Sequence, residues 1–215
     1  MTQLAERLAG KFIVIDGPDG AGKTTQVDML AEFLAAAGVD LCRVRDPGGT
    51  TIGDKIREIL LDPSHDQMSV ECELMLYMAS RAQLARQVIR PALSAVRCVL
   101  SDRYISATIA YQGAGGADTV AVATAARIAV GDTMPDLTVI LDIEAETGLA
   151  RVAGARSTDR IESKDVEYHR KVRQMFLAQA SAATKRFAVI STDASVEDVQ
   201  KCLRNTIETW DWTQG

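Results

Sequence analysis

Short runs of apolar residues alternate with longer stretches in which apolar residues recur every three or four positions. The short runs predict buried β-strands at Phe12 to Ile15, Leu41 to Val44, Val96 to Leu100, Leu137 to Leu141 and Phe187 to Ile190. The longer stretches predict helices at Thr24 to Ala37, Thr51 to Leu61, Val70 to Leu93, Ala117 to Val130, Glu146 to Val152, Val166 to Thr184 and from Ser195 onward. This alternation predicts an α/β fold: a three-layer sandwich with a five-stranded parallel sheet flanked by helices.

One polar stretch interrupts the alternation after the fourth predicted strand. Residues Ala153 to Asp165 are polar and charged and show no clear period. The chain has 215 residues, of which 47% are hydrophobic, and no low-complexity linker divides it. A chain of this size supports one well-filled core. We therefore expect a single domain over residues 1–215, with a mobile flap at about 150–165.

The long helix predicted at Val70 to Leu93 has two open interpretations. Its Leu, Met and Ala residues could supply a dimer surface, and core packing explains them nearly as well. Pro91 is expected to kink or end the helix, because proline lacks the N–H group and clashes with the preceding turn.

Composition and charge exclude several classes of function. A net charge of −5 argues against broad binding of nucleic acid, although a few arginines can still bind a small anion. With only two histidines and no CxxC pair, a zinc site is not expected. The chain shows no signal peptide and no run near ~20 apolar residues, so we expect a soluble cytoplasmic protein without a membrane partner. We expect buried, reduced thiols at Cys42, Cys72, Cys98 and Cys202.

The strongest local motif lies between the first predicted strand and the helix that follows it. Residues Gly17 to Thr24 match G-x-x-x-x-G-K-[ST] at every fixed position. Glycines let backbone N–H groups converge on phosphate oxygens, and the helix N-terminus adds its positive dipole end. Lys23 can reach the β- and γ-phosphates, and the Thr24 hydroxyl can bind Mg²⁺. The motif predicts a P-loop that binds a nucleoside triphosphate.

A P-loop by itself leaves several functions open. A GTPase would need an N-K-x-D motif, which this chain lacks, and 215 residues are few for a motor ATPase. A kinase and a non-catalytic, nucleotide-regulated binding protein both remain as interpretations of the motif.

Further segments give the chain a resemblance to a known family. They are Arg45 to Thr50, Leu76 to Gln83, Asp102 to Tyr104 with Ala110 to Gly113, Pro135 to Thr138 with Leu141 and Asp142, and Asp159 to Glu162. With the P-loop, they resemble the thymidylate kinase family, in register from about residue 11 to residue 191. The resemblance implies transfer of the γ-phosphoryl group of ATP to dTMP, with Mg²⁺ as cofactor and a homodimer as the assembly. A kinase of another nucleotide, such as dUMP, is the close alternative.

The composition suits this reaction on chemical grounds. The second pKa of a phosphate monoester is about 6, so an acceptor phosphate is already deprotonated at pH 7 and needs no strong general base. Catalysis then depends on positioning and charge neutralisation, which call for arginines and Mg²⁺ and for few histidines.

The resemblance assigns roles residue by residue. The residues expected to bind ATP are Gly17, Gly20, Ala21, Gly22, Lys23, Thr24, Thr25, Arg151 and Arg160. Those expected to bind dTMP are Asp19, Arg45, Asp46, Tyr77, Arg81, Arg103, Tyr111 and Gln112. Mg²⁺ is expected at Thr24, Asp102 and Glu162, and direct catalytic roles are expected for Lys23, Arg103, Arg156 and Asp19.

The acceptor base and sugar are assigned to two segments. Tyr77 and Arg81 lie four residues apart on one predicted helix and so face the same way. The ring can stack on a pyrimidine and the guanidinium can bind its carbonyl edge, although Tyr77 also fits as a core residue. The resemblance implies that Tyr111 packs where a 2′-hydroxyl would lie and that Gln112 lies over the base.

The phosphate and metal roles also rest on the resemblance. It gives the acceptor phosphate to Arg103 and Arg45, and it places Asp19 near the acceptor 3′-hydroxyl or the metal. Asp102 is expected either to bind Mg²⁺ through water or to orient Arg103. The P-loop has no arginine, so the flap is expected to supply one of Arg151, Arg156 and Arg160, whereas Lys164 is assigned to solvent.

Besides a mild departure at Tyr77, where phenylalanine is usual, two departures from the family pattern affect the acceptor pocket. Asp46 stands where glutamate is common, and Ala107 where serine is common. A neighbouring hydroxyl, on Ser106 or Thr108, is expected to replace the missing one.

Overall fold

Five parallel strands form the centre of the computed structural model, which describes residues 2–153 and 159–213. The strands are β1 (Phe12–Asp16), β2 (Leu41–Arg45), β3 (Cys98–Asp102), β4 (Leu137–Asp142) and β5 (Phe187–Ser191), in the spatial order β2-β3-β1-β4-β5. The central strand β1 is buried along its whole length, whereas the edge strand β2 alternates between buried and exposed residues. The predicted five-stranded parallel sheet is confirmed.

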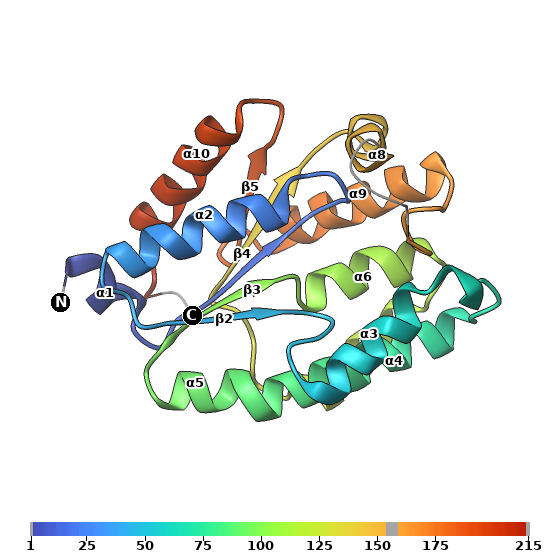
Figure 1. Ribbon diagram of the computed structural model, residues 1–215, viewed down its shortest axis with the longest axis horizontal. Coiled ribbons are helices and arrows are strands. Elements are labelled where there is room, and N and C mark those ends of the chain that lie inside the picture. The colour runs from blue at the N-terminus through green and yellow to red at the C-terminus, as the bar shows by residue number, and fades with distance from the viewer. Residues whose placement is uncertain (1, 154–158, 214–215) are drawn as a thin grey trace.

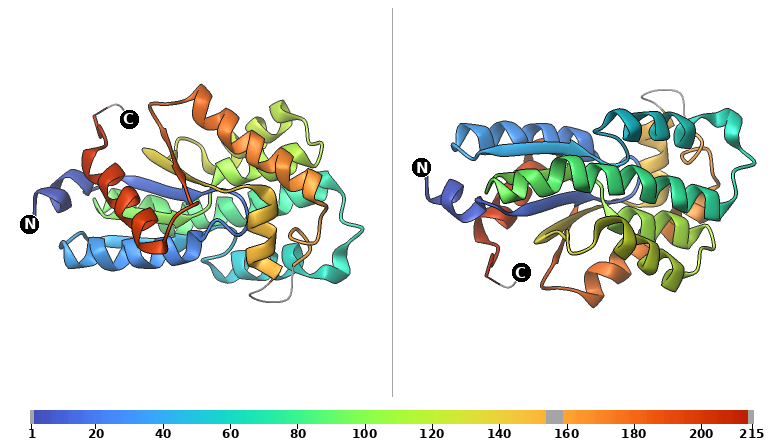
Figure 2. Two further views of the ribbon diagram at one scale, coloured as in Figure 1. Left: turned by 90° about the horizontal axis from the view of Figure 1, so that it is seen from above. Right: turned by 90° about the horizontal axis from the view of Figure 1, so that it is seen from below.

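Helices cover both faces of this sheet (Figures 1 and 2). The face toward the top of Figure 1 carries α2 (Lys23–Ala36) and α10 (Val196–Thr209), with α1 (Gln3–Leu8) at its end. The opposite face carries α4 (Val70–Leu84), α5 (Arg90–Ser94), α6 (Ile105–Ala114), α7 (Thr119–Val130) and α9 (Val166–Ala182). Two further helices flank the edge where the strands end, namely α3 (Thr51–Leu61) and α8 (Ala145–Ala153). The predicted three-layer sandwich is therefore confirmed.

The apolar core lies on both sides of the sheet. One cluster joins β1, β3 and β4 to α2 and α10 through side chains such as Val27, Leu30 and Leu203. A second cluster joins the other face to α4, α5 and α7, and a third lies between α6, α9 and β4. Core packing therefore accounts for the apolar face of the Val70 to Leu93 stretch, one of the two interpretations of that helix.

The parallel register brings the carboxyl ends of three strands to one edge. Asp102 of β3 pairs with Ile15 of β1 on one side and with Arg45 of β2 on the other. The segments that leave these strands therefore start side by side, and open α/β sheets bind ligands at this edge.

Several predicted boundaries were wrong. Val96 was expected to open the third strand, but it lies in a turn at φ +61°, is 60% exposed, and precedes a strand that begins at Cys98. The long helix passes through Pro91 to Ser94, with a π-helical turn at Ala85–Ile89 just before the proline. That turn accommodates the missing N–H group of Pro91 without ending the helix.

Other expectations also need correction. Helix α6 (Ile105–Ala114) was not predicted, because buried residues cover nearly its whole circumference and give it no amphipathic period. Cys72 and Cys202 are exposed, so burial holds only for Cys42 and Cys98; all four thiols are free. Within the described ranges, no helix is both long and apolar enough to cross a membrane.

Candidate active site

A cleft of about 1260 Å³ opens at the carboxyl edge of the sheet. It is lined by residues that follow β1, β2 and β3, together with parts of α3, α4, α6 and the segment after residue 158. All eight residues predicted to bind the acceptor line it, and so do the three predicted metal ligands. Of the residues predicted to bind ATP, those that line it are Gly20, Gly22, Lys23, Thr24, Thr25 and Arg151. The sequence motifs therefore meet in one place.

The loop between β1 and α2 requires glycine at two positions for space as well as for backbone angle. Gly17 has φ +136°, and a Cβ there would overlap the carbonyl oxygen of Leu141. Gly20 has φ +76°, and a Cβ there would overlap the carbonyl of Gly148. Gly17 and Ala21 belong to the loop without lining the cleft. The loop is thus packed against the β4–α8 region, which holds its backbone in place.

Lys23 opens α2 and is folded back over the loop. Its Nζ donates hydrogen bonds to the carbonyl oxygens of Gly17 (3.0 Å) and Pro18 (2.6 Å). Burial and the nearby positive charge of Arg103 lower the pKa of Lys23 to about 8. A ligand that brings negative charge to this ammonium group would raise the pKa again.

This pKa predicts that ATP binding takes up protons in mildly basic solution. At pH 8.5 much of the free protein carries neutral Lys23, while the phosphates of ATP are already ionised. Binding should therefore bring net proton uptake, measured by isothermal titration calorimetry in two buffers of different ionisation enthalpy. Lys23→Arg keeps a permanent charge and should abolish the uptake. Equal uptake in both proteins would contradict the assignment.

Thr24 and Asp102 bring two oxygen donors together beside the P-loop. The Thr24 hydroxyl donates to Asp102 Oδ2 at 3.3 Å. No group of three or more His, Cys, Asp or Glu side chains that could hold a metal occurs within residues 2–153 and 159–213. Mg²⁺ at nucleotide sites is typically held by one or two protein oxygens, with phosphates and water completing its shell. The Thr24–Asp102 pair fits that kind of site.

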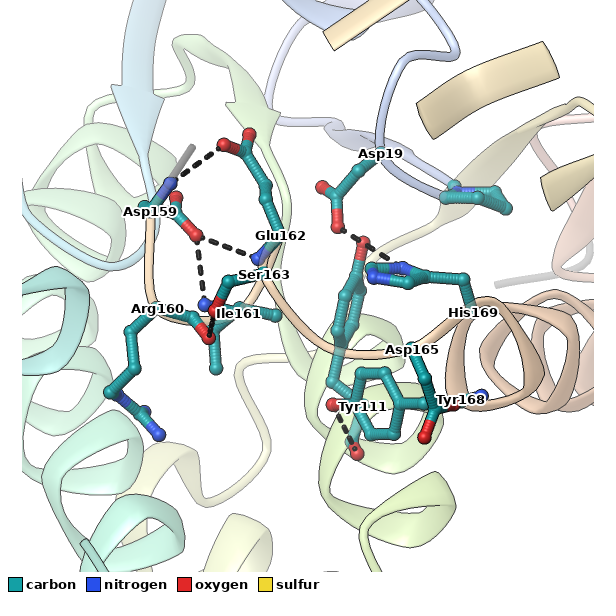
Figure 3. Close-up of polar contacts among 12 residues, drawn as sticks. Asp19, Tyr111, Asp159, Arg160, Ile161, Glu162, Ser163, Asp165, Tyr168 and His169 are labelled. Carbon is teal, nitrogen blue, oxygen red and sulfur yellow. Dashed lines mark hydrogen bonds and ion pairs between the residues drawn. The ribbon is translucent and has the colours of Figure 1, made fainter. Parts of the chain in front are cut away.

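Glu162, the third predicted metal ligand, belongs to a turn that Figure 3 shows on the far side of the cleft from the P-loop. Its carboxylate accepts from the backbone N–H of Asp159 at 3.0 Å. In return, the Asp159 carboxylate accepts from the N–H groups of Ile161 and Glu162, each at 2.9 Å. These local bonds fix the turn, and Asp159, Ile161 and Glu162 all line the cleft.

Arg103 connects the loop between β1 and α2 to Tyr111, one of the residues predicted to bind the acceptor. Its Nη1 donates to Asp16 (3.1 Å) and to the carbonyl oxygen of Gly17 (3.0 Å). Its Nη2 donates to Asp19 (2.6 Å) and to the Tyr111 hydroxyl (3.0 Å). Arg103 has φ +67°, a conformation that costs energy for a residue with a Cβ and is common at functional sites.

The pKa values of the two carboxyl groups next to Arg103 are shifted in opposite directions. Burial raises the pKa of Asp16 above its usual value, and the charge of Arg103 and a hydrogen bond from Ser106 only partly oppose this shift. Burial also acts on Asp19, but the charges of Arg103 and Lys23 outweigh it and leave the pKa of Asp19 below its usual value. Asp19 is therefore an anion at neutral pH. No motif in the sequence marks Asp16, which ends a fully buried strand.

One of the two histidines, His169, lies next to the site, although from the sequence the low number of histidines served only as an argument against a zinc site. His169, in the first turns of α9, is buried, and its Nδ1 lies 4.0 Å from Asp19 Oδ2 (Figure 3). Neither that carboxylate oxygen nor His169 Nε2 has a hydrogen-bond partner in the described structure. No sequence motif could have paired two residues so far apart along the chain.

A buried ion pair forms the floor of the predicted base pocket. The Nε of Arg81 donates to Asp46 Oδ2, and both side chains are almost fully buried. The Arg81 guanidinium also lies over the Tyr104 ring, 5.5 Å from its centroid. Tyr77, one turn earlier on α4, is half-buried and lines the cleft. In this it differs from its neighbour Met78, which is buried in the core.

One hydroxyl is free to replace the serine expected at position 107. The Ser106 hydroxyl donates to Asp16 at 2.6 Å, which turns it away from this role. Thr108 is 1% exposed and lines the cleft, and its Oγ1 has no hydrogen-bond partner within the described residues. Of the two candidates left open by the sequence, Thr108 is the one with an available hydroxyl.

A second arginine, Arg57, lines the cleft together with Arg45. Arg45 is exposed and lies 3.8 Å from Asp54, while Arg57 donates to the carbonyl oxygen of Pro47 at 3.1 Å. Burial and the charge of Arg45 lower the pKa of Arg57. Both arginines line the cleft. Arg57 was missed, because nothing in the sequence distinguishes it from Lys55 on the other side of Ile56.

The predicted flap arginines do not share one position. Arg151 lines the cleft, and its Nη1 approaches the carbonyl oxygen of Gly20 at 3.5 Å. Arg160 does not line the cleft; its buried guanidinium pairs with Glu73 and donates to the carbonyl oxygen of Leu60 at 3.0 Å. Arg156 lies outside the described residues. Lys164, assigned to solvent, instead has its ammonium group 4.3 Å from the centroid of the Tyr168 ring.

Comparisons with known proteins identify the family of this chain. The family model described as thymidylate kinase matches residues 15–203. A protein named thymidylate kinase from Alcanivorax borkumensis is 41% identical, covering 94% of this chain and 97% of its own length. One of the same name from an Exiguobacterium species is 43% identical, covering 94% and 96%. The solved structure of thymidylate kinase from Ehrlichia chaffeensis superposes with a TM-score of 0.76 at 28% identity, covering 93% of this chain and 98% of its own. Since relatives of this similarity span nearly the whole chain, the protein belongs to the thymidylate kinase family.

Proposed function

We propose that this protein transfers the γ-phosphoryl group of ATP to the phosphate of dTMP and releases ADP and dTDP. One observation carries the proposal: the cleft that holds the P-loop is also lined by a second group of cationic side chains, those of Arg45, Arg57 and Arg103. A protein that only sensed a nucleotide would need one phosphate site. Two facing anion sites suit transfer between two phosphates.

The chemistry follows from where the charges lie. The acceptor oxygen is already ionised near neutral pH, so no side chain has to remove a proton from it. Lys23 is proposed to follow the phosphoryl group as it moves, and Arg103 to hold the acceptor phosphate in line with it. The carboxylates of Asp16 and Asp19 keep the Arg103 fork in a fixed orientation. Thr24 and Asp102 would hold Mg²⁺, which would neutralise charge on the phosphates, and Glu162 is the further proposed ligand.

The base and sugar would lie on the α4 and α6 side of the cleft. Tyr77 offers a ring for stacking, and Arg81 and Thr108 offer hydrogen-bond donors to the carbonyl edge of a pyrimidine. Of the flap residues, Arg151 and Arg156 are the proposed contacts to ATP, while the pairing of Arg160 with Glu73 favours a role in holding the flap to α4. The homodimer and the cytoplasmic location stay predictions.

Tyr111 is proposed to exclude ribonucleotides by the bulk of its ring. The ring packs edge-on against Phe176, with centroids 5.9 Å apart, and its hydroxyl accepts from Arg103. Tyr111→Phe keeps the ring and should keep the preference for dTMP over its ribose counterpart, whereas Tyr111→Ala should narrow it. The ratio of the two kcat/KM values, measured within each variant, cancels any loss of folded protein. An unchanged ratio in all three proteins would refute the steric role.

Transfer itself can be followed with ATP that carries a labelled γ-phosphate. We expect the label to appear in dTDP in equal amount to the ADP formed, and only when dTMP is present. Release of the label as inorganic phosphate at the same rate without dTMP would indicate an ATPase instead.

A further inference from the structure

Glu73 is a buried carboxylate to which the proposed function gives no role beyond its pairing with Arg160. It lies on α4, is 4% exposed, and accepts two side-chain hydrogen bonds. Its Oε1 accepts from Nε2 of Gln112 at 2.7 Å, and its Oε2 accepts from Nη2 of Arg160. A buried charge requires such partners, so the carboxylate is held in one orientation by α6 on one side and by the flap segment on the other.

The bond to Glu73 determines which way the Gln112 amide points. A glutamine amide has one end that only accepts and one end that only donates. An ionised carboxylate only accepts, so the amide must turn its NH₂ group toward Glu73. Gln112 lines the cleft, and no donor in the described part of the chain bonds to its Oε1. The oxygen is therefore the end available to a ligand.

Arg160 makes this arrangement rigid. Its guanidinium is buried, donates to Glu73 and to the carbonyl oxygen of Leu60, and has no acceptor atom of its own. It can therefore satisfy only an oxygen at Glu73. As long as Arg160 occupies one oxygen of the carboxylate, the other faces Gln112.

We propose that Glu73 is a specificity-determining positioning residue, which holds the Gln112 amide so that its oxygen faces the acceptor base. An oxygen acceptor at that point suits a pyrimidine whose ring nitrogen carries hydrogen, as in thymine and uracil. It disfavours cytosine, whose ring nitrogen is itself an acceptor. The inference rests on the proposed function in one respect, that the acceptor base lies beside Gln112.

Glu73→Gln tests the inference with almost no change in size. The new side chain has one oxygen and one NH₂ group. Arg160 can bond only to the oxygen, so the NH₂ group faces Gln112, which must then turn its own oxygen inward and its NH₂ group toward the cleft. The variant should lose at least about tenfold in affinity for dTMP relative to dCMP, because one hydrogen bond is replaced by two facing donors. Dissociation constants for both nucleotides, measured by titration calorimetry, give this ratio without requiring turnover.

Two further proteins separate specificity from folding. Glu71→Gln makes the same change at an exposed position on the same helix and should leave the ratio unchanged. Gln112→Leu should itself lower discrimination between dTMP and dCMP, and in that background Glu73→Gln should cause no further change in the ratio. If Glu73→Gln does not fold, Gln112→Leu still tests whether the Gln112 amide discriminates between the two bases, and the role of Glu73 depends on that discrimination.

Weaker binding of dTMP and dCMP by the same factor in Glu73→Gln would overturn the inference, since Glu73 would then only brace the fold. Undiminished discrimination in Gln112→Leu would overturn it too. If the wild-type protein instead failed to bind dTMP at all, the proposed function would be contradicted, not the role of Glu73 alone.

Discussion

Lys23→Ala should lower kcat by about 10³ or more while leaving the protein folded. Lys23 is the cation at the start of α2, and in the described state its ammonium group binds the P-loop carbonyls of Gly17 and Pro18. The same group can exchange these carbonyls for phosphate oxygens when ATP binds. A positioned charge that follows the phosphoryl group stabilises the transition state more than bound ATP, so the loss should appear in kcat.

The matched control for this variant is Lys201→Ala. Lys201 is an exposed lysine on α10, outside the cleft, and its removal should leave kcat unchanged. Melting temperatures of both variants should stay close to that of the wild type, because burial of the Lys23 ammonium group contributes little net stability. Near-normal turnover by folded Lys23→Ala would contradict the assignment of Gly17 to Thr24 as a P-loop that binds ATP.

Arg103→Ala should cause a loss of about 10³ or more in kcat/KM for dTMP. Its four hydrogen bonds tie the first strand, the P-loop and α6 to one guanidinium group. Without it, Asp16 and Asp19 lose their shared cation at the point where the acceptor phosphate would bind. The anionic Asp19 would then repel that phosphate, so binding and turnover should both suffer.

Arg103→Lys distinguishes charge from geometry at this position. A lysine restores a point charge but cannot form four bonds in the plane of a fork, so it should recover only part of the loss. Arg127→Ala, which removes an exposed arginine from α7, should have no effect on kcat/KM. An Arg103→Ala protein with unchanged kcat/KM for dTMP would show that this residue is structural.

The sheet could be predicted from the sequence because its strands are short, apolar and bounded by polar turns. β1, β3 and β4 are almost wholly buried, and that is the condition under which a continuous apolar run predicts a strand. Helix α6 was not predicted because its residues are buried on nearly every side. Without a polar face, its sequence shows no helical alternation of apolar and polar residues. The turn at Val96 was missed because its apolar side chain, two residues before Cys98, was taken as the start of the strand.

Within the site, too, local features could be predicted from the sequence and contacts between distant residues could not. The P-loop is a contiguous motif whose backbone geometry depends on its own glycines, so its chemistry could be predicted locally. Pairs such as Arg81 with Asp46 and Arg160 with Glu73 join residues 35 and 87 positions apart. Arg160 was expected at ATP because it is one of the arginines of the predicted flap and the P-loop has none. Only the packing of that segment against α4 shows that its side chain turns away from the cleft.

Acceptor-dependent release of ADP is the most direct test that one cleft transfers a phosphoryl group from ATP to dTMP. A coupled assay should compare dTMP, dUMP, UMP, CMP and AMP at equal concentrations with ATP and Mg²⁺. We expect release of ADP with the highest kcat/KM for dTMP, weaker turnover of dUMP, and little with the other three. Release of ADP that is the same with and without dTMP, or a higher kcat/KM for another nucleotide, would contradict the assignment.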